Sequence, residues 1–315
     1  MKLILSRKGF DSSAGGCPNP IFPDGSMLAL PIPDSKSTVT YRDLQHQLPS
    51  GEVVEVSDLV SQLTKGKIKP AVGAHLDPDM ISSAYSREPN WRPVLGQTGA
   101  AQGHLAKQGV DVGDVFLFFG LFRDVEPYKE GRKKARWRFV PGSKPKHLLW
   151  GWLEIGEKLI IDQTNFSSSE SDRLMWLAYH PHMHGEPDAN NTLYLSSAMS
   201  MFADSPLDAK RAGHGIFNRV CEELILTQPS SYKNSPNKPS FWRLPEWFYP
   251  YQTDASHKNR EREPLSYHHK SNRWFEPSNG YCQLQSAARG QEFVLDVDQY
   301  PEAKTWLAGL IQRNS

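Results

Sequence analysis

The amino-terminal stretch combines charged and small residues, a pattern typical of a loop that binds an anion. The residues that follow the apolar segment 3–6 include Arg7, Lys8, Asp11, Ser12, Gly15 and Gly16. Such loops present backbone N–H groups to an anion, and nearby cations add charge. We expect Arg7 and Ser12 to contact phosphate, and Lys8 and Asp11 to be catalytic, with Asp11 as a general base or an orienting carboxylate. The alternative is an ordinary turn in which Asp11 bonds its own backbone.

A histidine and two carboxylates alternate in the string His75-Leu76-Asp77-Pro78-Asp79. Alternate side chains of an extended segment project to one side, an arrangement that suits a metal ion or an acid–base pair. We name His75 and Asp77 as candidate catalytic residues. The alternative is a turn that opens a short helix over residues 80–85, with Asp79 capping that helix.

Three more histidines, His180, His182 and His184, recur at every second position. A metal site needs convergent ligands that are held by outer hydrogen bonds, and the sequence shows only the ligands. Pro181 and Gly185 predict an irregular turn, in which alternate side chains need not share a face. We therefore assign no metal ligand here and keep the three histidines as candidates for a metal-dependent hydrolase.

Glycines surround the amide side chains of Gln97 and Gln102. Amide groups can exchange hydrogen bonds with the edge of a base, and glycines let a ligand approach the backbone closely. We assign Gln97, Gln102 and the aromatic Trp150 to a base pocket. The alternative is a glycine-rich connection before a short helix over residues 100–108.

The densest positive charge lies between two apolar strand candidates, residues 115–119 and 148–155. The basic residues there are Lys129, Arg132, Lys133, Lys134, Arg136, Arg138, Lys144 and Lys146. Strand alternation places Arg136 and Arg138 on one face, and Trp137 and Phe139 on the other. We expect a hairpin over residues 129–146 that contacts phosphate, and the alternative is a solvated hairpin. The phosphate contacts are assigned to Arg132, Lys133, Lys134, Arg136 and Arg138.

Composition limits the classes of protein that fit. The chain has 315 residues, a formal net charge of +1 and 38% apolar residues. The near-neutral balance excludes nucleic-acid binding by overall charge, and neither a Walker sequence nor a dinucleotide fingerprint is present. No apolar run approaches the ~20 residues that span a bilayer, so we expect no membrane partner. Cys17, Cys221 and Cys282 form neither a disulfide framework nor a zinc ribbon, which predicts a cytoplasmic protein.

The elements that must position these residues are short. Strands are predicted over residues 2–6, 27–30, 115–119, 136–139, 148–155, 159–162, 192–196 and 292–296, and helices over residues 40–47, 56–63, 100–108 and 301–313. The mixture predicts an α+β fold with a curled, largely antiparallel sheet, flanking short helices and a long irregular carboxyl-terminal arm. We expect one domain over residues 1–315. Its segments are a loop-rich half at 1–110 with the candidate active site, a strand region at 111–200 and an aromatic, basic region at 201–315.

Two strings in the middle of the chain resemble a known fold. These strings are Gly113-Asp114-Val115-Phe116-Leu117-Phe118-Phe119 and Leu149-Trp150-Gly151-Trp152-Leu153-Glu154. They resemble the central strands of PUA-like barrels, a group that includes the ASCH and EVE domains. Those folds accommodate a nucleotide or an altered base, so the resemblance implies a PUA-like barrel core.

Nearly the whole chain resembles the nucleotide modification associated domain 3 family. The strings that carry this resemblance include Leu5-Ser6-Arg7-Lys8-Gly9-Phe10-Asp11-Ser12, Gly73-Ala74-His75-Leu76-Asp77-Pro78-Asp79, His180-Pro181-His182 and Gly290-Gln291-Glu292-Phe293-Val294-Leu295-Asp296. The resemblance implies an association with systems that modify bases in DNA, and it implies other components of such a system as partners. It implies no particular reaction, and the cofactor stays unknown.

Three functions fit these observations. The first is an enzyme that acts on a nucleotide or on a flipped base in nucleic acid, with DNA as the expected polymer. The second is a non-enzymatic reader that binds modified nucleic acid through a PUA-like pocket, with the basic hairpin on the phosphates. The third is the histidine-dependent metal hydrolase. We favour the first, and nucleic acid or a nucleotide is the expected partner.

Overall fold

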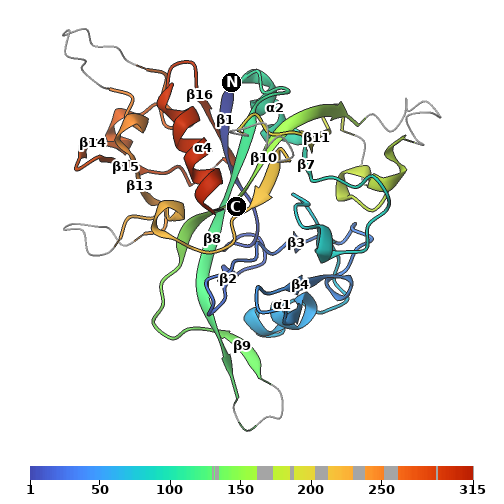
Figure 1. Ribbon diagram of the computed structural model, residues 1–315. Coiled ribbons are helices and arrows are strands. Elements are labelled where there is room, and N and C mark those ends of the chain that lie inside the picture. The colour runs from blue at the N-terminus through green and yellow to red at the C-terminus, as the bar shows by residue number, and fades with distance from the viewer. Residues whose placement is uncertain are drawn as a thin grey trace.

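The computed structural model describes residues 1–129, 131, 135–161, 173–184, 188–202, 212–229, 238–251, 262–288 and 290–314. These residues form a mixed fold built on one large sheet, so the expected α+β class is confirmed (Figure 1). The helices are α1 (Val56–Leu63), α2 (Gly99–Lys107) and α4 (Glu302–Asn314). Short 3-10 helices cover Tyr41–Asp43, Ser82–Ala84, Met175–Leu177, Pro181–Met183, Glu222–Leu224, Glu246–Phe248 and Ser271–Arg273. Within these ranges no helix has the length and apolar character needed to cross a bilayer.

The large sheet has the strand order β16-β1-β8-β10-β11-β7. These strands are β1 (Lys2–Arg7), β7 (Val94–Gln97), β8 (Val115–Tyr128), β10 (Lys146–Ile160), β11 (Thr192–Ser196) and β16 (Glu292–Asp296). Three further strands join it: β12 (His214–Ile216) on β10, and β2 (Asn19–Ile21) and β9 (Arg136–Phe139) on β8. β1 and β2 run parallel to β8, and the other pairs are antiparallel. The sheet is therefore mixed.

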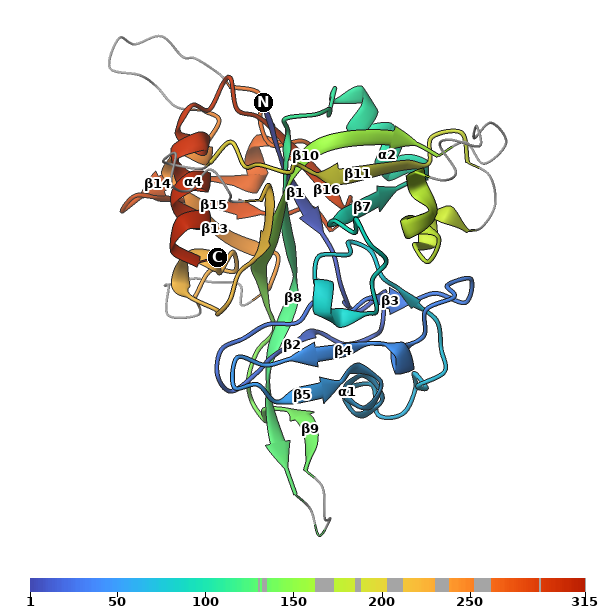
Figure 2. The same cartoon turned by 45° about the vertical axis from the view of Figure 1, so that its right-hand side comes forward.

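The centre of the sheet is covered on both faces. β1 and the first half of β8 are nearly continuous apolar runs, and Ile4, Phe116 and Phe118 are fully buried, as is typical of strands between two layers. Figure 2 shows α4 and a small sheet on one side of β8, and α2 and β7 on the other. The small sheet consists of β13 (Phe241–Pro245), β15 (Tyr281–Gln285) and β14 (Trp274–Ser278). Part of the carboxyl-terminal arm, which was expected to be irregular, is therefore a β-sheet.

The large sheet curls, but its described strands do not close into a barrel. Its edges are β16 and β7, which share no backbone ladder. A side-chain hydrogen bond joins them instead, from Gln97 at the end of β7 to Glu292 at the start of β16. β7 has four residues, and α2 begins two residues after it. This edge therefore offers only a short stretch of backbone that could pair with β16. The closed PUA-like barrel that the resemblance implied is thus not seen.

Strand β10 merges two expected strands, residues 148–155 and 159–162, into one. Its first part pairs with β8 and its last part with β11, with an irregularity between Ile155 and Glu157. Gly156 lies at this irregularity, where a Cβ atom would be 2.5 Å from Cα of Ser197. The glycine lets the backbones approach closely enough for β11 to extend the sheet.

The amino-terminal segment forms a second core around α1. The buried face of this helix consists of Val56, Leu59, Val60 and Leu63, at the spacing of one helical stripe. The helix predicted over residues 40–47 is wrong, because Tyr41–Asp43 is a 3-10 turn and β4 (Gln45–Gln47) pairs with β5 (Val53–Glu55). His46 is buried between two exposed glutamines, and this period of two is that of a strand.

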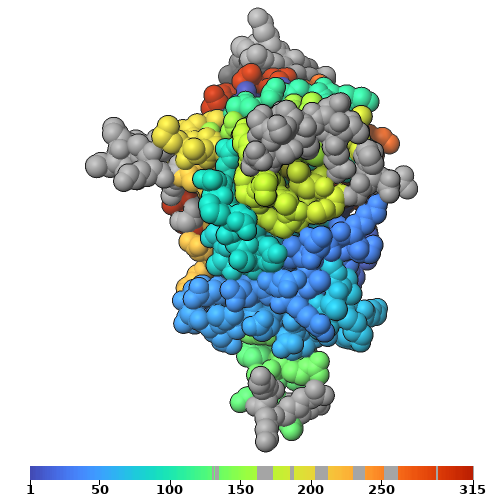
Figure 3. All heavy atoms as spheres, turned by 90° about the vertical axis from the view of Figure 1, so that its right-hand side faces the viewer, coloured from blue at the N-terminus to red at the C-terminus, as the bar shows by residue number. Residues whose placement is uncertain are grey.

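Two short elements bring distant segments together on one face of the molecule. β3 (Ile32–Pro33) pairs with β6 (Ala74–His75), and Ile32 opposes His75. A third apolar cluster, which includes Val94 and Leu177, supports Met183 in the turn Pro181–Met183. Figure 3 shows the blue, teal and yellow-green segments meeting on this face.

Candidate functional site

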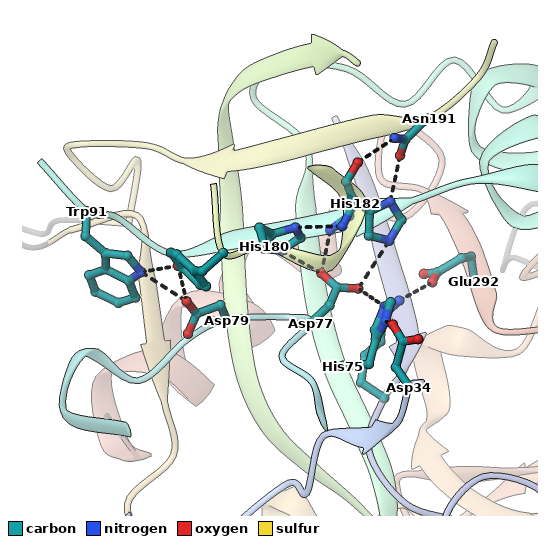
Figure 4. Close-up of polar contacts among 12 residues, drawn as sticks. Asp34, His75, Asp77, Asp79, Trp91, His180, His182, Asn191 and Glu292 are labelled. Carbon is teal, nitrogen blue, oxygen red and sulfur yellow. Dashed lines mark hydrogen bonds and ion pairs between the residues drawn. The ribbon is translucent and has the colours of Figure 1, made fainter. Parts of the chain in front are cut away.

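Histidine and aspartate side chains from two segments converge at this face (Figure 4). His75 ends β6, Asp77 follows two residues later, and His182 comes from the turn Pro181–Met183. Nε2 of His75 and Nε2 of His182 each lie 3.9 Å from Oδ2 of Asp77. One ligand atom from each residue lies within 4.8 Å of the other two. The structure therefore joins two sequence candidates, His75 and Asp77, to one of the alternating histidines.

The two oxygens of Asp77 have different surroundings. Oδ1 accepts a hydrogen bond from the backbone N–H of Gly96 at 2.5 Å and lies 3.5 Å from Nε2 of His180. Oδ2 faces His75 and His182. Burial alone would raise the pKa of Asp77, but the nearby His180 and the positive charge of Lys8 hold that pKa well below its usual value. Asp77 is thus a buried, ionised carboxylate.

Hydrogen bonds at Nδ1 fix the orientation of both imidazoles. Nδ1 of His75 lies 2.9 Å from a carboxylate oxygen of Asp34, whose pKa this bond lowers. Nδ1 of His182 lies 2.7 Å from Oδ1 of Asn191. Because Asn191 donates its amide N–H to the His182 carbonyl, its Oδ1 is the acceptor. Each Nδ1 therefore carries a proton, and in the neutral ring each Nε2 presents a lone pair.

His180 is held in the opposite tautomer. Its Nδ1 accepts the backbone N–H of His182 at 3.3 Å, so in the neutral ring the proton is on Nε2, which faces Asp77. The predicted irregular turn explains the difference between the two rings, since 3-10 geometry does not keep alternate side chains on one face. His184 lines the adjoining pocket instead.

A polar pocket of about 500 Å³ borders this cluster. Its lining residues are Asp34, Lys36, His75, Thr98, Pro181, His182, His184, Asp188, Ala189 and Asn191. The volume lies in the range of small-molecule sites, roughly 300–1,000 Å³. The pocket wall offers carboxylate, amide, hydroxyl and ammonium groups. A separate cavity, lined mainly by apolar residues, borders Asp77 together with Trp150.

A second buried polar network adjoins the first. Glu292 accepts hydrogen bonds from Ser6 and Gln97 and pairs with Lys8, whose Nζ lies 3.3 Å away. Burial raises the pKa of Glu292, and the charge of Lys8 opposes that rise. Lys8 also acts electrostatically on Asp77. The expected catalytic residue Lys8 therefore lies near the cluster. Its ion-pair partner, Glu292, was not among the predicted site residues.

Other candidates lie elsewhere. Oδ1 of Asp11 accepts the N–H groups of Ser13 and Ala14 at 2.7 Å, which are the contacts of the alternative turn. Arg7 donates to the carbonyl of Gly290 at 3.1 Å, and Ser12 is exposed. The structure does not bring these residues to the His75–Asp77–His182 cluster, and their roles stay predictions.

The predicted base-pocket residues do not share one cavity. Gln97 bonds Glu292, whereas Gln102 in α2 accepts the hydroxyl of Tyr194 at 2.9 Å in the core. Trp150 stacks on Phe118, with ring centroids 5.2 Å apart. Gln97, Gln102 and Trp150 are all buried. Their assignment to a base pocket also remains a prediction.

The basic hairpin projects from the far end of β8. Trp137 packs edge-on against Phe22 at 5.2 Å, so the aromatic face points inward as expected. Arg138 pairs with Glu126 at 2.8 Å, and Arg136 is partly buried. Arg132, Lys133 and Lys134 fall outside the described residues. Figure 2 shows β9 beyond α1, away from β7 and α2, so its described part is not beside the polar pocket.

Asp79 has a structural environment that sequence reasoning missed. Arg87 forms a two-pronged ion pair with it at 2.5 and 2.6 Å, and Trp91 and the hydroxyl of Tyr179 also donate to it. The expected helix over residues 80–85 is a 3-10 turn, Ser82–Ala84, and Asp79 does not cap it. This clamp of Asp79, Arg87, Trp91 and Tyr179 links the segment that contains Asp77 to the segment that contains His180.

Comparison with known proteins agrees with the resemblance read from the sequence. The family described as nucleotide modification associated domain 3 matches residues 2–296. No curated protein matches the chain, and no solved structure does. Because the match covers nearly the whole sequence and includes both segments of the cluster, the chain belongs to the nucleotide modification associated domain 3 family.

Proposed function

We propose that this protein is an enzyme that modifies a nucleobase bound in the polar pocket, with the chemistry at His75, Asp77 and His182. The observation that carries the proposal is the buried, ionised Asp77 facing two imidazoles whose orientations are fixed. A buried charge costs free energy unless it is fully compensated. A buried carboxylate that faces two oriented imidazoles next to an open pocket is the pattern of an active site.

The nature of the substrate is inferred from the family and the pocket together. The family description concerns nucleotide modification. Thr98, Asp188 and Asn191 line the pocket, and their hydroxyl, carboxylate and amide groups can exchange hydrogen bonds with the edge of a base. A base inside a duplex must leave the stack to enter such a pocket, whereas a free nucleotide enters directly.

The remaining sequence candidates take supporting roles in this proposal. Lys8 holds Glu292 and contributes positive potential at Asp77, so it orients the site and does not react. The basic hairpin contacts phosphates at a distance from the target base, because its described part lies beyond α1 and not beside the pocket.

Two broader predictions go with this proposal, a single domain and a cytoplasmic location. The main core cluster includes Leu3, Phe116 and Leu307, which supports a single domain made of all three chain segments. The three cysteines are free, which supports a reducing compartment such as the cytoplasm.

The test is mass spectrometry of nucleosides from DNA, RNA and the nucleotide pool of host cells. We expect a new or depleted nucleoside with the wild-type chain and none with Asp77→Asn, which keeps an oxygen for the Gly96 N–H. Asp58→Asn is the matched control, since Asp58 is exposed on α1. If nucleosides never change while Asp77→Asn still binds modified DNA like the wild type, the chain is a reader and the enzyme proposal fails.

A further inference from the structure

We propose that Nε2 of His75, Oδ2 of Asp77 and Nε2 of His182 bind one divalent first-row transition-metal ion. The inference goes beyond the proposed function, because it concerns the ion alone and holds whatever the substrate is.

The three converging atoms are all acceptors. In the neutral rings both Nδ1 atoms hold the imidazole proton against Asp34 and Asn191, so neither Nε2 has a proton to share. Oδ2 of Asp77 has none either, and the 3.9 Å separations are too long for hydrogen bonds. Lone pairs that face one another in a buried site repel, and a cation between them reverses the sign of that interaction.

Every candidate ligand is held from outside by another group. Asp34 orients His75, Asn191 orients His182, and the Gly96 N–H holds the other oxygen of Asp77. Metal-bound histidines characteristically donate their second N–H to a carboxylate or carbonyl oxygen, and this fixes both tautomer and ring direction. Acid–base catalysis alone would not require both rings to aim lone pairs at one carboxylate oxygen.

The spacing suits an ion with short bonds. Ligands about 2.0–2.2 Å from a tetrahedral ion lie roughly 3.3–3.6 Å apart. The two 3.9 Å separations therefore need to close by only a few tenths of an ångström, and all three ligand atoms already lie within 4.8 Å of one another. Two imidazole nitrogens and one carboxylate favour zinc or iron(II) over calcium or magnesium, which prefer oxygen ligands.

The cluster leaves coordination positions open. His75 and His182 line the polar pocket, so water or substrate can reach an ion bound between them. Three protein ligands with an open side are typical of catalytic sites, whereas structural zinc sites have four protein ligands. His180 is not a ligand in this arrangement, because its Nε2 proton faces the other oxygen of Asp77. His184 lines the pocket only.

The experiment measures uptake of Zn²⁺ and of Co²⁺ by the full-length chain, by calorimetry and by the absorption of bound cobalt. We expect one equivalent in the wild type and at least a 100-fold loss of affinity in His182→Ala and Asp77→Asn. Asp34→Ala should bind about 10–100-fold more weakly, because it removes the outer hydrogen bond to His75 and leaves all three ligands in place. His184→Ala and the exposed-site control His269→Ala should remain within about twofold of wild type.

Three results would overturn the inference. They are a wild-type chain that takes up neither ion, His182→Ala binding as tightly as wild type, and His184→Ala losing as much affinity as His182→Ala. Thermal unfolding checks each variant, and if His182→Ala does not fold, Asp34→Ala decides, since wild-type affinity there refutes the site. The uptake measurement contains no nucleotide, so metal uptake with unchanged cellular nucleosides refutes the proposed function alone. Nucleoside modification by a chain that takes up neither ion refutes only this inference.

Discussion

Substituting Gly96 with alanine tests the geometry of the cluster without removing any of its functional groups. Gly96 is not among the glycines with positive φ, so its backbone accepts alanine. The added Cβ would instead overlap the ring of His182, with Nε2 only 2.6 Å away. Because nonbonded atoms settle at roughly 3.5–4.0 Å and Cδ2 of the ring is only 2.2 Å from this Cβ, the ring must move by at least about 1.3 Å. Such a shift stretches the 2.7 Å bond from His182 to Asn191.

The expected cost has two parts. Overpacking a buried site destabilises by about 1–3 kcal/mol, and leaving a buried polar group unpaired adds about 1–3 kcal/mol. The reduced freedom of the unfolded chain offsets about 0.4–1 kcal/mol. We therefore expect the free energy of unfolding to fall by about 1–5.6 kcal/mol in Gly96→Ala, with metal affinity at least tenfold weaker.

Urea denaturation followed by tryptophan fluorescence measures the stability, and calorimetry with Zn²⁺ measures the affinity. The decisive variant is Gly96→Ala combined with His182→Ala, in which the ring that Cβ meets is gone. The double variant should be more stable than the sum of the single costs predicts, by at least about 1 kcal/mol. Strict additivity, or wild-type stability in Gly96→Ala, would refute the steric reasoning.

Three further predictions concern other parts of the molecule. Arg87→Ala should destabilise by about 3–5 kcal/mol because it leaves the buried Asp79 carboxylate without its cation; urea denaturation checks this, and a loss below about 1 kcal/mol would contradict the clamp. Burial lowers the pKa of His268 to about 4, and both ring nitrogens are already bonded to backbone groups. Its contribution to stability is therefore complete above the unfolded pKa of about 6.5 and is lost as the pH falls from there toward about 4; denaturation midpoints in His268→Gln should decline less between pH 7 and 5 than in wild type. Replacing Arg136 and Arg138 with glutamine should reduce the slope of log affinity for DNA against log salt by up to about 2, measured by fluorescence anisotropy, and an unchanged slope would exclude the hairpin from phosphate contact.

Local patterns predicted much of the secondary structure. The apolar stripe of α1, the alternation in β9 and the proline that precedes α4 each depend on neighbouring residues, so the sequence shows them directly. The helix expected over residues 40–47 failed because a strand that pairs with residues 53–55 competed with it. Such a pairing depends on a partner strand that local propensity does not report.

The site was predictable only in part, for the same reason. His75 and Asp77 were recognised because they alternate in a single string. Asp34 reaches His75 through the two-residue β3–β6 ladder, and so short a ladder leaves no periodic pattern. The histidines at 180, 182 and 184 alternate in the sequence, but the 3-10 turn gives them three different surroundings, and of the three only His182 faces Oδ2 of Asp77. The basic hairpin could be predicted from its dense positive charge, but no pattern in the sequence predicts that β9 lies beyond α1.

The two segments of the His75–Asp77–His182 cluster belong to different apolar clusters. Leu76 packs in the core around α1, whereas Met183 packs against the cluster of β7 and β11. An ion shared between the segments would act as a reversible crosslink that adds to the hydrogen bond from Tyr179 to Asp79, which already joins them. Resistance to unfolding would then rise with free metal concentration by mass action, about 2.7 kcal/mol at one hundred times the dissociation constant. Cellular metal supply would in this way govern the persistence of the folded chain as well as its chemistry.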